Sequence, residues 1–167
     1  NTIDSIELIS GGTTVDTIGS PGTGSHTFTG LYSNHAYTIR LTHSYDLQDG
    51  EGVRTEIVET SFTTDALNEP TASLQDETVS GDTLSVDVSA LSDTDNTVST
   101  MTLELYEDGS LVETIESVNG SSTYTFSTTI ATDTEYTVKL KADYDLNEEG
   151  GPQTGVTLDE TKIVILS

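Results

Sequence analysis

The sequence contains no cysteine, no tryptophan and no long apolar run. Without cysteine it has neither disulfides nor a thiolate metal site, so its stability must come from packed aliphatic and tyrosine side chains. No apolar stretch approaches the ~18 residues that a membrane-spanning helix needs, and the first residues show no signal-peptide pattern. We therefore expect a soluble chain that does not insert into membranes and is either processed or a fragment.

Basic residues are also scarce. Five Lys and Arg stand against 29 Asp and Glu, which gives a formal net charge of -24. This charge repels phosphate backbones and anionic lipid surfaces over a Debye length of roughly 8–10 Å, so nucleic acid is excluded as a partner. It suits a protein that must stay dispersed outside cells, and it attracts Ca²⁺ weakly.

Two long stretches of the sequence occur twice. Ile6–Ile18 aligns with Leu103–Ile115 at an offset of 97 residues, and Leu31–Gly52 aligns with Ile130–Gly151 at an offset of 99. Small loop insertions produce such a drift in repeated domains. We predict a partial domain over residues 1–66, a linker over 67–70 and a complete domain over 71–167.

Within each copy the hydrophobic pattern has a period of two. Apolar side chains occupy alternate positions from Tyr136 to Tyr144 and again, with one histidine among them, from Tyr37 to Tyr45. This alternation, bounded by glycine-containing turns, predicts antiparallel strands with one buried face and no helix. The second copy contains seven such stretches, at about 71–75, 83–91, 98–106, 111–118, 123–129, 135–144 and 154–166. The predicted fold class is all-β, with two tandem antiparallel sandwiches.

A distinctive corner precedes the sixth of these strands. It consists of Ile130, Asp133, Thr134, Glu135 and Tyr136. This run resembles the corner of fibronectin type III domains, which implies that Tyr136 is buried and that its hydroxyl bonds to the backbone upstream. Leu31 and Tyr37 hold the equivalent places in the first copy. The chain thus resembles fibronectin type III-like (Ig-like) repeats of bacterial surface proteins and exoproteins and of phage tail or virion structural proteins.

The first copy begins at the counterpart of the third strand of the second copy, because Ile6 aligns with Leu103. It therefore lacks the two N-terminal strands of a sandwich, which leaves an apolar face and an open edge. Either the missing strands lie upstream in a longer repeat array, or another chain donates them by strand complementation. The expected partners are accordingly neighbouring repeats or identical chains.

Acidic loops provide the candidate metal ligands. The stretch "YDLQDGEG" returns as "YDLNEEGG". Each copy reads as a plain hairpin connection, or as a weak calcium site that lacks the full ligand series of an EF-hand. The stretch "SDTDNT" allows the same two readings. The candidate calcium ligands are Asp46, Asp49, Glu51, Asp145 and Glu148 in the first pair of loops, and Asp93, Asp95 and Asn96 in the other loop.

No catalytic constellation is visible. His26, His35 and His43 have no metal spacing, and only His43 falls on the predicted inward face. Serines lack the sequence context of a nucleophile, and no pair of carboxylates is placed in a cleft. We predict that the chain is not an enzyme and has no cofactor.

The few basic residues have a structural explanation. Arg40, Lys139 and Lys141 lie on the outward face of the sixth strand of their copy. The neighbouring third strand presents Glu7 and Glu104 outward, so cross-strand ion pairs are expected.

These patterns favour a non-catalytic spacer, display or assembly module located outside the cell, on a cell surface or on a virion. Two alternatives remain open. The exposed Thr, Ser and Tyr106 side chains suit a carbohydrate-binding or adhesion module whose partner is a cell-surface glycan, although there is no tryptophan platform. An open sheet suits a strand-donating subunit of an extracellular filament.

Overall fold

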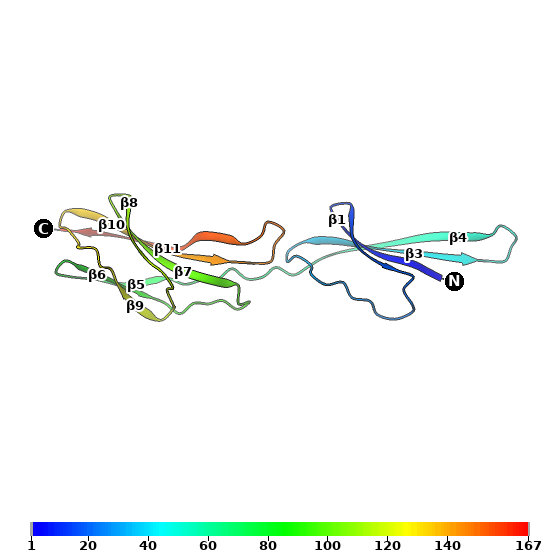
Figure 1. Ribbon diagram of the computed structural model, residues 1–167, viewed down its shortest axis with the longest axis horizontal. Helices are drawn as coiled ribbons and strands as arrows, with labels where there is room; N and C mark the ends of the chain where they lie inside the picture. Colours follow the sequence, from blue (N-terminus) through cyan, green and yellow to red (C-terminus); the bar gives the residue numbers. More distant parts are fainter. Residues whose placement is uncertain (1, 167) are drawn as a thin grey trace. The chain divides into compact units, whose positions relative to one another are not determined.

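The computed structural model describes residues 2–166, and every regular element among them is a β-strand (Figure 1). The chain divides into two compact units, which we call unit 1 (Asn1–Ala66) and unit 2 (Leu67–Ser167). The described residues include no helix that is long and apolar enough to cross a membrane. The predicted all-β class is confirmed.

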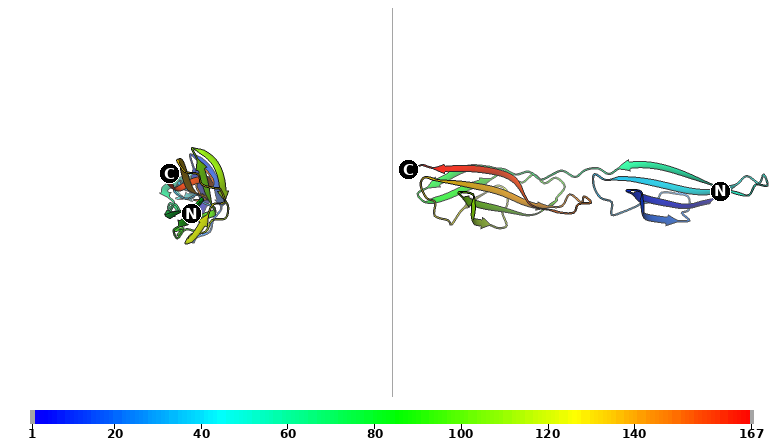
Figure 2. Two further views of the ribbon diagram at one scale, coloured as in Figure 1. Left: turned by 90° about the vertical axis from the view of Figure 1, so that its left-hand side faces the viewer. Right: turned by 90° about the horizontal axis from the view of Figure 1, so that it is seen from above.

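Unit 2 is a sandwich of two antiparallel sheets, with strand orders β5-β6-β9 and β11-β10-β7-β8. Its strands are β5 (Leu74–Ser80), β6 (Thr83–Val88), β7 (Val98–Glu107), β8 (Ser110–Ile115), β9 (Ser122–Thr125), β10 (Thr134–Tyr144) and β11 (Gln153–Ile165). The long strands of the unit run close to one direction (Figure 2). Seven strands in three-plus-four sheets confirm the fibronectin type III-like, Ig-like sandwich expected from the sequence.

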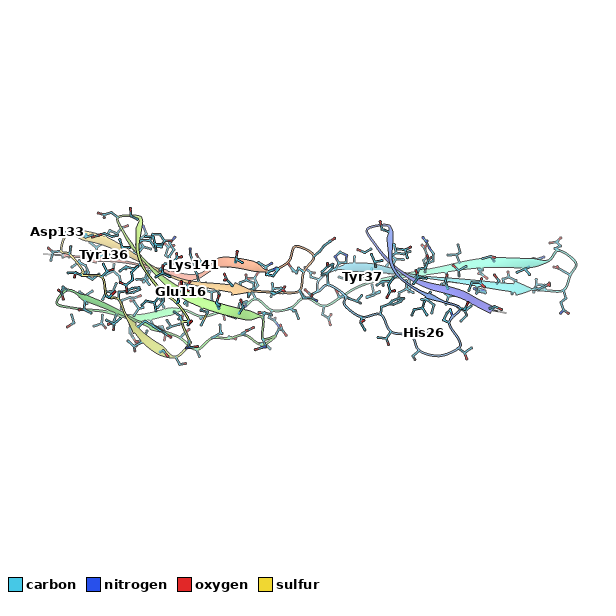
Figure 3. The ribbon with its side chains drawn as sticks, viewed as in Figure 1. His26, Tyr37, Glu116, Asp133, Tyr136 and Lys141 are labelled. Carbon is cyan, nitrogen blue, oxygen red and sulfur yellow. The ribbon has the colours of Figure 1, made fainter. Side chains whose placement is uncertain are left out.

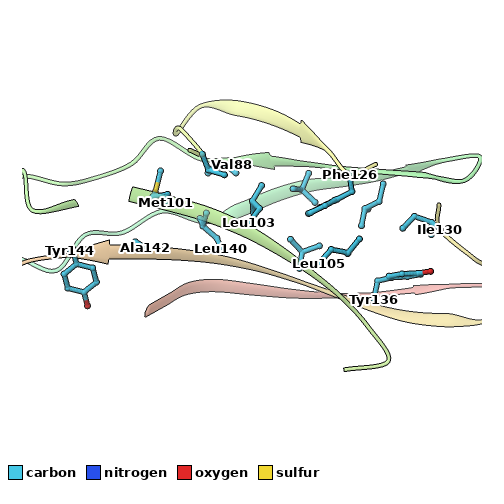
Figure 4. Close-up of a cluster of buried hydrophobic side chains, with 14 of the residues drawn as sticks. Val88, Met101, Leu103, Leu105, Phe126, Ile130, Tyr136, Leu140, Ala142 and Tyr144 are labelled. Carbon is cyan, nitrogen blue, oxygen red and sulfur yellow. The ribbon is translucent and has the colours of Figure 1, made fainter. Parts of the chain in front are cut away.

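The core of unit 2 lies between these two sheets. Along β10 every second side chain from Tyr136 to Tyr144 is buried, because successive residues of a strand point to opposite faces. The facing sheet contributes Leu84, Val86 and Val88 from β6, all at most 2% exposed. Figure 4 shows this cluster filled by aliphatic and aromatic side chains from both layers.

The first strand of unit 2 differs from its predicted range. It runs over Leu74–Ser80 rather than starting at residue 71. Thr71 instead forms an isolated bridge with Ser92 at the end of the sheet. The segment expected to be a linker packs onto unit 2: Leu67 contacts its core, Pro70 is buried and Asn68 donates two hydrogen bonds to Asp95.

Unit 1 is a single antiparallel sheet with the strand order β2-β1-β3-β4. Its strands are β1 (Thr2–Ser10), β2 (Thr13–Gly19), β3 (Ala36–Asp46) and β4 (Val53–Thr63). They correspond in order and pairing to β7, β8, β10 and β11. Gly11 and Gly12, with φ of 54° and 81°, form the tight turn between β1 and β2, as the glycine signal predicts.

Among residues 2–66, unit 1 has no counterpart of three strands of unit 2. The absence of the first two confirms the prediction. The counterpart of β9, residues 24–27, lies outside every strand of the described structure. In unit 2 β9 pairs only with β6, so without that partner the same segment of unit 1 has no ladder to join.

Candidate functional site

The outward face of the four-stranded sheet of unit 2 carries most of the basic side chains. Lys141 Nζ lies 2.7 Å from Glu104 Oε2 on β7, and Lys139 Nζ lies 3.0 Å from Glu160 Oε2 on β11. The Tyr106 hydroxyl donates to Glu104 Oε2 at 2.6 Å, and Lys139 Nζ stands 5.3 Å from the centre of the Tyr106 ring. The face is a network of pairs that joins three strands.

These contacts shift the ionisation of the groups involved. Burial acts to raise the pKa of Glu104, but hydrogen bonds from Lys141 and Tyr106 outweigh it, so the pKa is lowered. The hydrogen bond to Glu104 raises the pKa of Lys141 and also that of Tyr106. All three shifts preserve the paired charge states at neutral pH.

Unit 1 repeats this arrangement with its arginine. Arg40 Nε donates to Glu59 Oε1 at 2.7 Å, and its Nη1 lies 3.6 Å from Glu7 Oε2. Glu7 and Arg40 are direct cross-strand neighbours. The expected pairing of Glu7 and Glu104 with basic residues of the neighbouring strand is confirmed in both units.

A shallow depression of about 220 Å³ lies at one end of the outward face of unit 2. Tyr106, Lys139 and Glu160 line it, together with Glu135 and Thr137. It offers one aromatic ring and several hydrogen-bonding groups, the combination that a sugar requires. Lys139 and the two glutamates each have a partner of opposite charge. Lys139 pairs with Glu160, and Lys162 approaches Glu135 at 3.3 Å.

The side chain of Arg54, near the start of β4, reaches the carboxylates of the first candidate calcium loop. Its guanidinium lies 2.6 Å from Asp49 Oδ2 and 2.9 Å from Glu51 Oε2. Asp46 Oδ1 accepts the backbone N–H of Gln48 at 2.7 Å, which is the hydrogen bond of an Asx turn. The positive charge beside the carboxylates of this loop is therefore that of the Arg54 side chain.

The loop between β6 and β7 uses its acidic residues to hold backbone. Asp93 accepts hydrogen bonds from Thr97 N–H, Thr97 hydroxyl and Val98 N–H at 2.8, 3.0 and 2.9 Å. Burial acts to raise the pKa of Asp93, but these hydrogen bonds outweigh it and the pKa is lowered. Asp95 accepts from Asn68, and Asn96 adopts a positive φ of 55°.

The second YDL loop has no arginine, and its candidates also bond within the turn. Asp145 Oδ1 accepts the N–H of Asn147 at 2.7 Å, and the Glu148 carbonyl accepts the N–H of Gly151 at 2.9 Å. Across residues 2–166, the structure brings together no group of three or more His, Asp or Glu side chains placed to hold a metal. Calcium binding stays a prediction from the sequence.

The three histidines lie at separate places in unit 1. His26 Nε2 is 3.0 Å from the Gly22 carbonyl, and His35 Nε2 is 2.6 Å from Ser10 Oγ. His43 stacks beside Tyr45 on one face of β3 and its Nε2 lies 3.5 Å from Glu56. Figure 3 shows His26 on the connection between β2 and β3, apart from the strands.

The predicted corner hydrogen bond exists in both units. The Tyr136 hydroxyl oxygen accepts the N–H of Ala131 at 3.0 Å, and the Tyr37 oxygen accepts the N–H of Tyr32 at 3.0 Å. Both rings are buried, at 0% and 4% exposure. Tyr136 additionally donates to Glu107 at 2.9 Å.

Sequence reasoning did not identify Glu113. Its two carboxylate oxygens accept four hydrogen bonds, from the N–H and hydroxyl groups of Ser127 and Thr128, at 2.7–2.9 Å. These bonds tie the connection after β9 to the edge strand β8. No local pattern reveals this, because the partners lie 14 and 15 residues away.

No protein-family model matches the chain, and no curated protein sequence matches it. One similar solved structure is described as "Structures of Clostridium thermocellum CbhA fibronectin(III)-like modules". The match covers 98% of this chain and 78% of the chain in that structure, with 15% sequence identity and a TM-score of 0.37. At that level the likeness does not bear on function.

Proposed function

We propose that this chain is a non-catalytic structural module, a spacer or display element of an extracellular protein. One observation carries the proposal: the side chains that could form a reactive or ligand site hold strands and turns together instead. Lys141 pairs with Glu104, Arg54 with Asp49, and Glu113 binds the backbone of the next connection. Groups committed to such pairs are costly to redirect to a ligand.

The length of the strands indicates the reach of each unit in the proposed spacer. The longest strand, β11, has 13 residues, and at about 3.3 Å per residue it spans roughly 40 Å. Each additional unit of this kind therefore lengthens a polypeptide by several tens of ångströms. The net charge of -24 opposes lateral association of such modules.

The proposed setting is a bacterial surface protein or a phage tail or virion appendage. This finer statement rests on the resemblance carried by the corner residues around Tyr136 and by the repeated YDL loops. The charge supports an exposed location, because a strongly anionic shell keeps a protein dispersed.

A carbohydrate-binding module is the second candidate, and the depression beside Tyr106 favours it. The ring offers a stacking surface, and Thr137 and the charged groups around it offer donors and acceptors. In this reading the outward face of unit 2 contacts a cell-surface glycan.

Binding to a glycan array distinguishes the two functions. The spacer function predicts no saturable binding by the 167-residue chain, and no difference between the wild type and Tyr106→Ala. Saturable binding that Tyr106→Ala removes, while the thermal transition of unit 2 is unchanged, would replace the spacer with the glycan-binding function. Thr125→Ala, on the three-stranded sheet, is the matched control for a change outside the depression.

A further inference from the structure

Unit 1 displays part of an aliphatic face that unit 2 buries completely. Leu103, Val138 and Leu140 of unit 2 are 0% exposed beneath β6 and its neighbours. Their counterparts in unit 1, Ile6, Ile39 and Leu41, are only half-buried. Val58, the cross-strand neighbour of Leu41, is 51% exposed. Aliphatic side chains that share one sheet face and remain open to water mark a contact surface.

The connection between β2 and β3 keeps the local contact of the missing layer. In unit 2 the Tyr124 hydroxyl accepts the N–H of Asn119 at 2.6 Å and donates to its carbonyl at 3.2 Å. In unit 1 His26 stands at the place of Tyr124, and its Nε2 lies 3.0 Å from the carbonyl of Gly22, four residues upstream rather than five. A ring thus bonds back to the backbone in both units.

The same connection carries an apolar side chain suited to a core. Phe28 aligns with Phe126, which is 2% exposed in unit 2, but Phe28 is only half-buried. Residues 24–27 align with β9, whose residues pair with Ser85–Val88 of β6. Residues 24–28 of unit 1 therefore offer a backbone edge and an apolar side chain for a second layer. The described part of unit 1 has no strands that pair with this edge.

We propose that this face of unit 1 is the docking site of a β-hairpin of the β5–β6 kind, supplied by another repeat on the same polypeptide. The second strand of the hairpin pairs with residues 24–27, and its alternate aliphatic side chains cover Ile6, Ile39 and Leu41. In unit 2 the side chains in that position are Leu84, Val86 and Val88. The hairpin adds main-chain hydrogen bonds at the edge and closes the apolar face at once.

Two observations favour the same polypeptide over a second copy of this chain. In unit 2 only residues 89–97 separate β6 from β7, so a covalently joined hairpin reaches the sheet at a high effective concentration. Two copies would each bring a charge of -24, and the one β5–β6 hairpin of each copy is already part of unit 2. The inference concerns what completes unit 1 and is independent of the spacer function.

The test adds a second copy of residues 70–97 directly before Asn1. This reproduces the spacing of unit 2, because Val98 aligns with Asn1 at the offset of 97. The matched control carries Leu84→Thr, Val86→Thr and Val88→Thr in the added copy alone. Both chains keep unit 2 intact as an internal reference.

We expect the added hairpin to slow hydrogen exchange at the amides of residues 25–28 by about a hundred-fold or more, and the control copy to leave them unchanged. Equal exchange in the two fusions would overturn the proposal. Dimerisation of the unmodified chain that protects the same amides would also overturn it, because a second copy would then be the occupant. Glycan binding at another surface would contradict the spacer function, but it would not change the exchange expected at residues 25–28.

Discussion

The hydroxyl oxygen of Tyr136 accepts a hydrogen bond from the backbone N–H of Ala131, five residues earlier in the chain, at 3.0 Å. The ring is fully buried, and this burial raises the pKa of the hydroxyl, so it remains protonated at neutral pH. It can therefore also donate to Glu107. One side chain thus closes the connection before β10 and ties it to the end of β7.

Replacing this tyrosine tests the corner. Tyr136→Phe keeps the buried ring but leaves the Ala131 N–H without its acceptor, so we expect the free energy of unfolding of unit 2 to fall by about 1–3 kcal/mol. Urea unfolding followed by circular dichroism measures the change. Tyr106→Phe is the control, because the half-buried hydroxyl of Tyr106 bonds to Glu104 on the outward face of the sheet. Equal losses of stability in the two variants would refute the special role of the corner.

Glu113 should make stability depend on pH. Burial acts to raise its pKa, but the four hydrogen bonds from Ser127 and Thr128 outweigh it and lower the pKa below the ordinary 4.5. A carboxylate with a lowered folded-state pKa stabilises the protein above its unfolded-state pKa and loses this contribution as pH falls through the folded-state pKa.

We therefore expect Glu113→Gln to cost about 1–2 kcal/mol at pH 7, with a smaller difference from wild type as the pH drops below about 4.5. Denaturant unfolding of both chains between pH 7 and pH 3 measures it. Taking the difference between the two chains removes the effect of the other carboxylates. A gap that stays constant over this range would show that the charge of Glu113 contributes nothing.

Gly120 lies where a side chain does not fit. A Cβ atom there would stand 2.5 Å from the backbone nitrogen of Leu91 and 2.8 Å from the carbonyl oxygen of Ser89. Backbone atoms cannot swing aside as a side chain can, so Gly120→Ala should destabilise unit 2 by about 1–3 kcal/mol or more.

The control for this substitution is Gly150→Ala, because no atom lies within 4 Å of the added carbon at Gly150 and its φ is not positive. Thermal unfolding of the two variants should separate them by several degrees. If Gly120→Ala unfolds together with Gly150→Ala, the close approach of residues 89–91 to Gly120 is wrong.

Arg54 should determine how the first acidic loop responds to calcium. Its guanidinium pairs with both Asp49 and Glu51, so millimolar Ca²⁺ should raise the Tm of the wild type no more than Mg²⁺ does. Arg54→Gln removes this partner and should make the Tm more sensitive to Ca²⁺, since a bound ligand stabilises the folded state. A calcium-specific rise in wild-type Tm would support the metal reading of the loop instead.

The strands of unit 2 were predictable because their pattern is local. Alternate apolar residues from Tyr136 to Tyr144 define both β10 and its buried face, and the glycines between strands mark the turns. The corner hydrogen bond of Tyr136 was implied by the resemblance that a short run of residues carries, and the structure contains it.

The other features depend on contacts between residues far apart in the chain, which the hydrophobic pattern of the sequence does not reveal. Residues 24–27 and β9 have similar sequences, yet only β9 forms a strand, because β6 lies beside it. Glu113 binds residues 14 and 15 positions away, across a connection whose path no local pattern gives. One difference between the two copies was visible in the sequence: the position of Arg54 is occupied by a glutamine, Gln153, in the second copy.

The central claim is that unit 2 is a complete sandwich and unit 1 is a single sheet with an open edge. Amide hydrogen exchange of the unmodified chain, at a concentration where light scattering gives the monomer mass, tests this most directly. The account predicts slow exchange at residues 122–125, whose ladder with β6 opens only with larger unfolding, and fast exchange at residues 25–28. Equally slow exchange at residues 25–28 in the monomer would contradict it.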